Sequence, residues 1–173
     1  MRACHGASTR TGEGDSAQSA RYIPVMPRAA VPLTRQAEDY LKAIHALELG
    51  GEAAGTTDIA ARLGIAAASV SGMLRRLAGQ GLVTVERYKG AHLTAAGRRE
   101  ALQLIRRHRI IESYLVERLG FVGEAVHEEA ERLEHAASDA LIARMADALG
   151  HPTLDPHGAP IPAARRATRG GDR

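Results

Sequence analysis

The chain has few aromatic side chains and almost no cysteine. Its 173 residues include no tryptophan, one phenylalanine and four tyrosines, so the core must be aliphatic, a composition that favours helices. Cys4 is the single cysteine, which excludes an intrachain disulfide and fits a reducing compartment. No apolar run approaches the ~20 residues that a membrane-spanning helix needs. We therefore expect a soluble, cytoplasmic protein with no membrane partner.

Charge is distributed unevenly along the sequence. Residues 34–109 hold 12 basic and 7 acidic side chains, a net +5, whereas residues 110–162 hold 3 basic and 10 acidic ones, a net −7. A basic region suits a polyanion, and an acidic region that also contains histidine suits a cation. Either region could also be an ordinary solvated surface, so charge alone leaves the function open.

The hydrophobic periodicity predicts a mainly α-helical protein in four segments. Residues 1–33 are rich in small and polar residues and read as a disordered extension. Two short helices with a glycine between them, followed by a hairpin, indicate a winged helix-turn-helix over 34–97. A helical region follows over 98–162, and a basic, disordered tail over 163–173. The predicted elements are helices from Thr34 to about Leu49, Asp58–Leu63 (capped by Thr56 or Thr57) and Ala67–Gln80, a hairpin over Gly81–Thr94, and helices from Thr94 to Gly120 and from Gly123 to Leu149.

The helix over 67–80 is the expected recognition helix, which would enter the major groove of double-stranded DNA. Ser69 and Ser71 can hydrogen-bond phosphate oxygens, and Arg75 and Arg76 can supply positive charge. At the hairpin tip we expect the contacts to the DNA backbone or minor groove to come from Arg87, Tyr88 and Lys89. The alternative is a winged helix that binds protein, or a basic surface with no partner.

The phrase His127-Glu128-Glu129-Ala130-Glu131-Arg132-Leu133-Glu134-His135 is the most specific in the chain. Residues three or four apart share a helix face, so one stripe gathers the two histidines with Glu131 and Glu134. Carboxylate oxygen with imidazole nitrogen suits Mn(II), Fe(II), Co(II) or Zn(II). One helix cannot complete such a site, and the candidates for further ligands are Asp39 and the i, i+4 pair His108 and Glu112. An exposed acidic face without metal is the alternative.

These phrases together resemble the diphtheria toxin repressor family over about residues 33–162. The resemblance is carried by Glu38-Asp39-Tyr40-Leu41, by the wing ending in Gly90-Ala91-His92-Leu93-Thr94-Ala95-Ala96-Gly97, by Arg106-Arg107-His108-Arg109, by the His127 to His135 phrase with Ser138-Asp139, and by the closing Gly150-His151-Pro152, Asp155-Pro156-His157-Gly158 and Ile161-Pro162.

The resemblance implies a DNA-binding domain joined to a metal-binding and dimerisation domain. By position, Asp39, Glu131, Glu134 and His135 match the family's primary metal ligands, and His108, Glu112 and His127 match a second, ancillary site. Acids at 39 and 131 resemble the manganese-sensing branch, whereas the iron-sensing branch has methionine and cysteine there. Lys42 replaces a glutamate of some short members, which implies separated rather than closely paired ions. The chain stops before the SH3-like domain of longer members, so we expect no ancillary ligands from such a domain.

We accordingly predict a homodimeric, Mn(II)-dependent repressor that binds a palindromic operator of metal-uptake genes. In this hypothesis the acids repel one another until metal draws Asp39 toward Glu131, Glu134 and His135. The dimer surface is expected from Leu115, Leu119, Phe121, Leu141 and Ile142. The alternatives are an Fe(II)-responsive repressor of the same family and a winged-helix regulator without metal. An enzyme with a small-molecule substrate is not expected, because the di-iron pattern of paired Glu-x-x-His helices and the zincin pattern are both missing.

Overall fold

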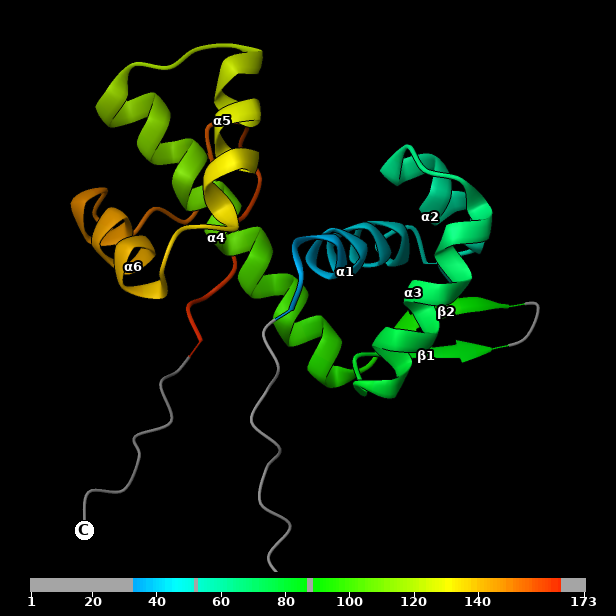
Figure 1. Cartoon of the computed structure of the whole chain (residues 1–173). Helices are drawn as coiled ribbons and strands as arrows, with labels where there is room; N and C mark the ends of the chain where they lie inside the picture. The colour runs from blue at the N-terminus through cyan, green and yellow to red at the C-terminus, as the bar shows by residue number, and fades with distance from the viewer. Residues whose placement is uncertain (1–32, 52, 87–88, 166–173) are drawn as a thin grey trace, which may run out of the picture. The chain divides into compact units, whose positions relative to one another are not determined.

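The computed structural model describes residues 33–51, 53–86 and 89–165. Within these ranges the chain forms six α-helices and one two-stranded antiparallel sheet (Figure 1). The predicted fold, a winged helix-turn-helix followed by a helical region, is confirmed. The predicted disordered extension and basic tail lie almost wholly outside the described residues. The elements are α1 (Arg35–Glu48), α2 (Thr56–Leu63), α3 (Ala67–Gly79), β1 (Val83–Glu86), β2 (Gly90–Leu93), α4 (Ala95–Leu119), α5 (Glu124–Glu134) and α6 (Asp139–Ala148).

The winged helix-turn-helix is built from α1, α2, α3 and the β1–β2 hairpin. The Thr34 hydroxyl caps α1 by accepting a hydrogen bond from the Ala37 N–H at 3.3 Å. The turn between α2 and α3 begins at Gly64, which has a φ of 65°. Glycine adopts this left-handed conformation without strain. The predicted threonine cap of α2 is wrong, because Thr56 is already helical and Gly55 occupies the N-cap position. In the hairpin, Val83 lies opposite Leu93.

The long helix α4 starts in the winged helix and continues into the helical region, where it packs against α5 and α6 (Figure 1). The Thr94 hydroxyl caps it by accepting from the Gly97 N–H at 3.0 Å, and donates to the Gly81 carbonyl at 2.7 Å. Gly97 lies directly on the Leu82 carbonyl, because a Cβ at position 97 would be 1.9 Å from that oxygen. This close fit fixes where α4 leaves the wing.

The predicted single helix from Gly123 to Leu149 is wrong, because the structure has two helices there, α5 and α6. α5 ends at Glu134 with His135 as its C-cap, and Ser138 begins α6 by accepting a hydrogen bond from the Leu141 N–H at 3.2 Å. The apolar spacing continues across the break between α5 and α6, so periodicity alone could not reveal that break. Ser138 was the available signal for the start of a new helix, because serine is favoured at the N-cap position just before the first helical residue.

Two hydrophobic cores lie along α4. The first joins the winged helix to the start of α4 and contains large buried residues such as Tyr40, Leu41 and Ile59, and the second lies among α4, α5 and α6. Leu115 and Ile142 pack in the second core, so they are not available for the predicted dimer surface, whereas Leu119 and Leu141 are exposed. No helix among the described residues is long and apolar enough to cross a membrane.

Candidate metal centre and nucleic-acid interface

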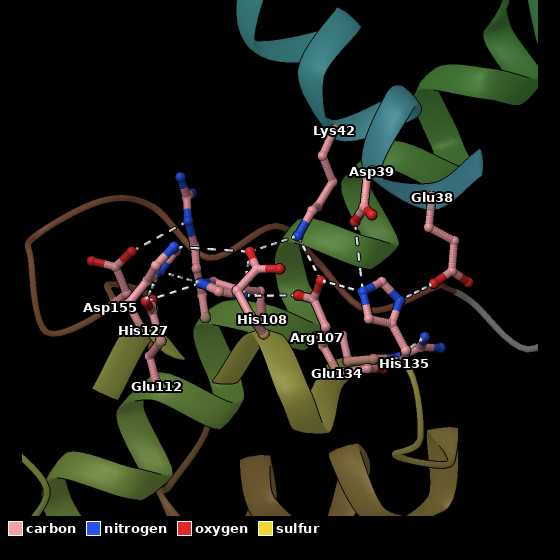
Figure 2. A network of polar contacts seen from close by, with 12 residues as sticks. Glu38, Asp39, Lys42, Arg107, His108, Glu112, His127, Glu134, His135 and Asp155 are labelled. Carbon is pink, nitrogen blue, oxygen red and sulfur yellow. Dashed lines mark hydrogen bonds and ion pairs between the residues drawn. The ribbon is translucent and has the colours of Figure 1, made fainter. Parts of the chain in front are cut away.

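Side chains from α1, α4 and α5 meet in one polar network (Figure 2). α1 contributes Glu38, Asp39 and Lys42, which lie within one helical turn and point toward the end of α5. α4 contributes the i, i+4 pair His108 and Glu112. The predicted ligand residues of α5 and its cap complete the network, so all seven predicted metal-ligand residues lie in this region: Asp39, His108, Glu112, His127, Glu131, Glu134 and His135.

The structure sorts these seven residues into two clusters. In the first, which we name the primary cluster, Asp39, Glu131, Glu134 and His135 each offer one oxygen or nitrogen, and these four atoms all lie within 4.8 Å of one another. Glu134 is almost fully buried, whereas Asp39 and Glu131 are about one-third exposed. The primary cluster therefore joins α1 to α5 and stays accessible from one side.

His135 is oriented by an acid that the sequence reasoning did not assign. Its Nδ1 lies 2.6 Å from a carboxylate oxygen of Glu38, which can accept the Nδ1–H hydrogen bond. The other ring nitrogen, Nε2, is buried and has no hydrogen-bond partner, and it lies 3.2 Å from Glu134 Oε1 and 3.6 Å from Asp39 Oδ1. A buried ring nitrogen that lies beside carboxylates without a hydrogen-bond partner is a group that a bound cation would use, and carboxylates such as Glu38 commonly orient metal-ligating histidines.

Lys42, which the sequence analysis gave only as a departure from some short members of the family, also enters the network. Its ammonium donates to Glu131 Oε1 at 3.1 Å and to Glu134 Oε1 at 2.5 Å. The acids were expected to repel one another without metal, but two of them share this ammonium. The sequence feature that could have placed Lys42 in the site is its position on α1, because Lys42 follows Asp39 by three residues and so shares its helix face. Glu38 is adjacent to Asp39, and adjacent residues do not share a helix face, so spacing gave no such indication for Glu38.

The second cluster, which we name the ancillary cluster, consists of His108, Glu112 and His127. Glu112 Oε1 lies 2.9 Å from His108 Nε2 and 3.2 Å from His127 Nδ1. Glu112 and His108 are largely buried, whereas the side chain of His127 is 63% exposed. His127 therefore lies with the α4 pair, which is the grouping that the resemblance implies, and not with Glu131, Glu134 and His135, with which it was also expected to share one stripe of the helix.

His108 connects the two clusters. Its Nδ1 lies 2.8 Å from Glu134 Oε2 in the primary cluster, and its Nε2 faces Glu112 and His127. Burial alone would lower the pKa of His108, but hydrogen bonds with Glu112 and Glu134 outweigh it and raise the pKa to about 9. A proton on this ring must leave before either nitrogen can bind a metal ion.

The acids of the two clusters differ in whether hydrogen bonds offset the effect of burial on their pKa. Burial works to raise the pKa of Glu134, but hydrogen bonds from His108 and Lys42 bring the pKa below its usual value. Glu112 behaves in the same way, with His108 and His127 as its partners. Asp39 has no such hydrogen bond, so burial raises its pKa despite the nearby charge of Lys42. At Asp39, unlike at Glu134 and Glu112, the effect of burial on the pKa therefore outweighs that of the neighbouring positive charge.

On the winged helix, the predicted DNA contacts share the exposed face of α3. Val70, Met73, Leu74 and Leu77 form its buried face. Ser69, Ser71, Arg75 and Arg76 are all exposed. Lys89 at the wing is also exposed and pairs with Glu86 at 3.0 Å. Arg87 and Tyr88 lie outside the described residues. The described groups therefore offer hydroxyls and positive charge on an open surface.

Two family patterns match the chain. The pattern described as "Iron dependent repressor, N-terminal DNA binding domain" matches residues 32–91, and "Iron dependent repressor, metal binding and dimerisation domain" matches residues 94–163. The iron-dependent repressor IdeR of Mycobacterium leprae is 38% identical over 125 residues, which are 72% of this chain and 54% of the relative. The chain thus spans about half the length of that curated relative.

Solved structures give a similar result. The structure of a manganese-dependent transcriptional repressor in complex with manganese matches with a TM-score of 0.65 and 46% identity, covering 74% of this chain and 59% of the other. The manganese regulator SloR matches with a TM-score of 0.68 and 37% identity, covering 76% and 61%. These relatives therefore include an iron-dependent repressor and manganese-dependent regulators.

Proposed function

Because the chain belongs to the iron-dependent repressor family, a family of DNA-binding transcriptional repressors and not of enzymes, we propose that it is a manganese(II)-dependent repressor. In this proposal residues 34–97 read DNA in the cytoplasm, and residues 98–162 bind the metal and form a homodimer. The observation that carries the proposal is the convergence of Asp39 on α1 with Glu131, Glu134 and His135 around a buried, unpartnered imidazole nitrogen.

The donor set supports manganese over softer metals. Three carboxylates and one imidazole supply oxygen and nitrogen, with no sulfur among them. Hard and borderline oxygen donors suit Mn(II), although the order of divalent-metal affinities means that cellular availability also contributes to selectivity. The resemblance to the manganese-sensing branch, with acids in place of methionine and cysteine, supports the same choice. Iron(II) is the second candidate, because the IdeR relative is named as iron-dependent.

The protein's part in the mechanism is to connect the metal ligands to the DNA-reading surface. A bound ion would supply one positive centre for ligands from two helices. Asp39 is carried by α1, α1 packs against α2, and α2 packs against α3. An ion held by Asp39 and the end of α5 would therefore add a second link between the recognition helix and the helical region, beside the packing of α1 on α4. If that region forms the dimer, the two recognition helices then take the spacing of successive major grooves.

The DNA contacts in this proposal come mainly from the phosphate backbone. Ser69 and Ser71 would donate to phosphate oxygens, while Arg75, Arg76 and the wing residues Arg87, Tyr88 and Lys89 would add charge and hydrogen bonds. Such contacts position a protein but carry little sequence information. We infer that apolar contacts and DNA shape supply much of the sequence preference, and that the operator is palindromic and belongs to metal-uptake genes.

The proposal is tested by selecting random-sequence DNA duplexes with the full chain, with Mn(II) or with a chelator, at one fixed salt concentration. Fixed salt is needed because phosphate contacts make affinity steeply salt-dependent. We expect a palindromic sequence to be enriched only with Mn(II). Asp39→Asn should abolish the enrichment, while Asp147→Asn, which removes an exposed acid of α6 outside both clusters, should not. Equal enrichment in chelator would contradict the proposal and favour the metal-independent regulator. Activation by Fe(II) at lower concentration than Mn(II) would favour the iron-responsive alternative.

A further inference from the structure

Lys42 places a positive charge inside the primary cluster. Its side chain is only 19% exposed, and its ammonium contacts Glu131 Oε1 and Glu134 Oε1. Figure 2 shows Lys42 reaching from α1 toward Glu134. Both acids belong to α5, whereas Lys42 belongs to α1. The lysine therefore cross-links the same two helices that a metal ion held by Asp39, Glu131 and Glu134 would cross-link.

The oxygens that Lys42 uses are among those a metal ion would need. Glu134 has both oxygens engaged, Oε1 with Lys42 and Oε2 with His108. Glu131 offers Oε1 to Lys42, and its other contacts, with His108 and His127, are longer at 3.9 Å. A divalent ion on these oxygens would stand beside the ammonium, where two positive charges repel strongly in a partly buried setting.

We propose that Lys42 is a tethered competitor of the activating metal ion, an inference that rests on the proposed function. The ammonium neutralises Glu131 and Glu134 when the ion is absent and must withdraw when an ion binds both acids. The exchange replaces a cross-link that uses only Glu131 and Glu134 by one that also includes Asp39 and His135. It raises the metal concentration at which the second cross-link forms. Metal selectivity is sharpened as well, because an ion with too little affinity for carboxylates cannot displace the lysine.

The structure gives the displaced ammonium a place to go. An open cleft of about 510 Å³ adjoins the primary cluster and is lined by Asp39, Lys42, Arg62, His127 and Glu131, among others. Lysine carries its charge on a flexible four-carbon stem, so rotation about the stem can move the ammonium from the two acids into this cleft. The backbone of α1 need not move for the exchange.

The test measures Mn(II) affinity of the full chain by calorimetry at fixed pH and salt, for the wild type and for Lys42→Met. We expect Lys42→Met to bind Mn(II) at least about 10-fold more tightly, because no charge must be displaced. In chelator its melting temperature should fall below that of the wild type, since Glu131 and Glu134 lose their shared cation. Mn(II) should restore it, which shows that the variant folds.

Two control variants separate competition from general charge effects. Lys42→Arg keeps a positive charge within reach of the acids and should bind Mn(II) within about 3-fold of the wild type. Arg132→Met removes an exposed charge of α5 whose partners are Glu128 and Glu129, outside both clusters, and should also stay within about 3-fold.

The possible outcomes distinguish this inference from the proposed function. If the wild type binds Mn(II) and Lys42→Met binds it no more tightly, the competition is refuted while the metal site stands. If the variant melts at the wild-type temperature in chelator, Lys42 does not pair with the acids in solution, and the inference is again refuted. If neither protein binds Mn(II), the metal site itself is refuted, and the competition with it.

Discussion

The two halves of the described chain are stabilised by different forces. The winged helix and the start of α4 share an extended apolar core, which encloses few polar groups, among them His45 and the Glu48 side chain. The core among α4, α5 and α6 is smaller, and Glu112, Ser113, Glu134 and Asp155 are buried beside it. Apolar burial is insensitive to pH and ions, whereas buried acids depend on their partners. We therefore expect the DNA-reading half to be a fixed shape and the metal-binding half to respond to conditions.

The largest expected effect comes from breaking the fixed half. Gly97→Ala puts a Cβ against the Leu82 carbonyl, and we expect it to lower the free energy of unfolding by about 4 kcal/mol or more. Urea titration monitored by circular dichroism measures this, and Mn(II) should not rescue the variant. Gly72→Ala in α3 is the matched control, because nothing lies within 4 Å of its Cβ. It should stabilise the helix by roughly 0.5–1 kcal/mol. Equal stability of the two variants would contradict the packing at Gly97.

A second prediction uses pH to separate the halves. Because the pKa of His108 is raised to about 9, its stabilising contribution is complete below pH 6.5 and is lost as the pH rises through 9. In chelator the wild type should therefore lose on the order of 2 kcal/mol of unfolding free energy between pH 6.5 and pH 9. Urea titrations at each pH measure this loss.

The winged-helix half should show the opposite dependence. Burial lowers the pKa of His45, and the charge of Arg98 acts in the same direction, so its contribution is present above pH 6.5 and is lost as the pH falls below it. His108→Asn should remove the loss at high pH and keep the loss at low pH. A high-pH loss that persists in His108→Asn would contradict the role given to this ring.

The smallest expected effect concerns the orientation of His135. Glu38→Gln keeps the length of the side chain but weakens the hydrogen bond to Nδ1, and we expect Mn(II) affinity to fall about 10-fold. Calorimetry measures the affinity, and the chelator-treated variant should keep the wild-type melting temperature within a few degrees. Glu128→Gln, an exposed change on α5 away from both clusters, is the control. An unchanged Mn(II) affinity in Glu38→Gln would mean that Glu38 does not orient the imidazole ring of His135 for metal binding.

Much of the fold followed from local patterns. Helix periodicity, Gly64 and the hairpin spacing were enough for the winged helix, because each is a short-range signal. The break between α5 and α6 was missed since the apolar spacing continues through Ala136 and Ala137. Leu115 and Ile142 were misplaced on a dimer surface because periodicity identifies a buried face and does not say what covers it.

The site was predictable in its ligand types and less so in its connections. The i, i+4 pair His108 and Glu112 and the α5 phrase share helix faces, which sequence spacing reveals. The contacts of Lys42 with Glu131 and Glu134 cross 89 and 92 positions, and the contact of Glu38 with His135 crosses 97. Such pairings depend on how α1 packs against α5, and no local pattern encodes that packing.

The most direct test of the central claim is a crystal structure of the full chain grown with Mn(II), with anomalous diffraction used to locate the ion. We expect an anomalous peak in coordination contact with Asp39 on α1 and with Glu131, Glu134 and His135 at the end of α5, while the Lys42 ammonium has moved away. A peak that contacts only the α5 residues, with Asp39 turned away at saturating Mn(II), would contradict the link between metal and the DNA-reading half.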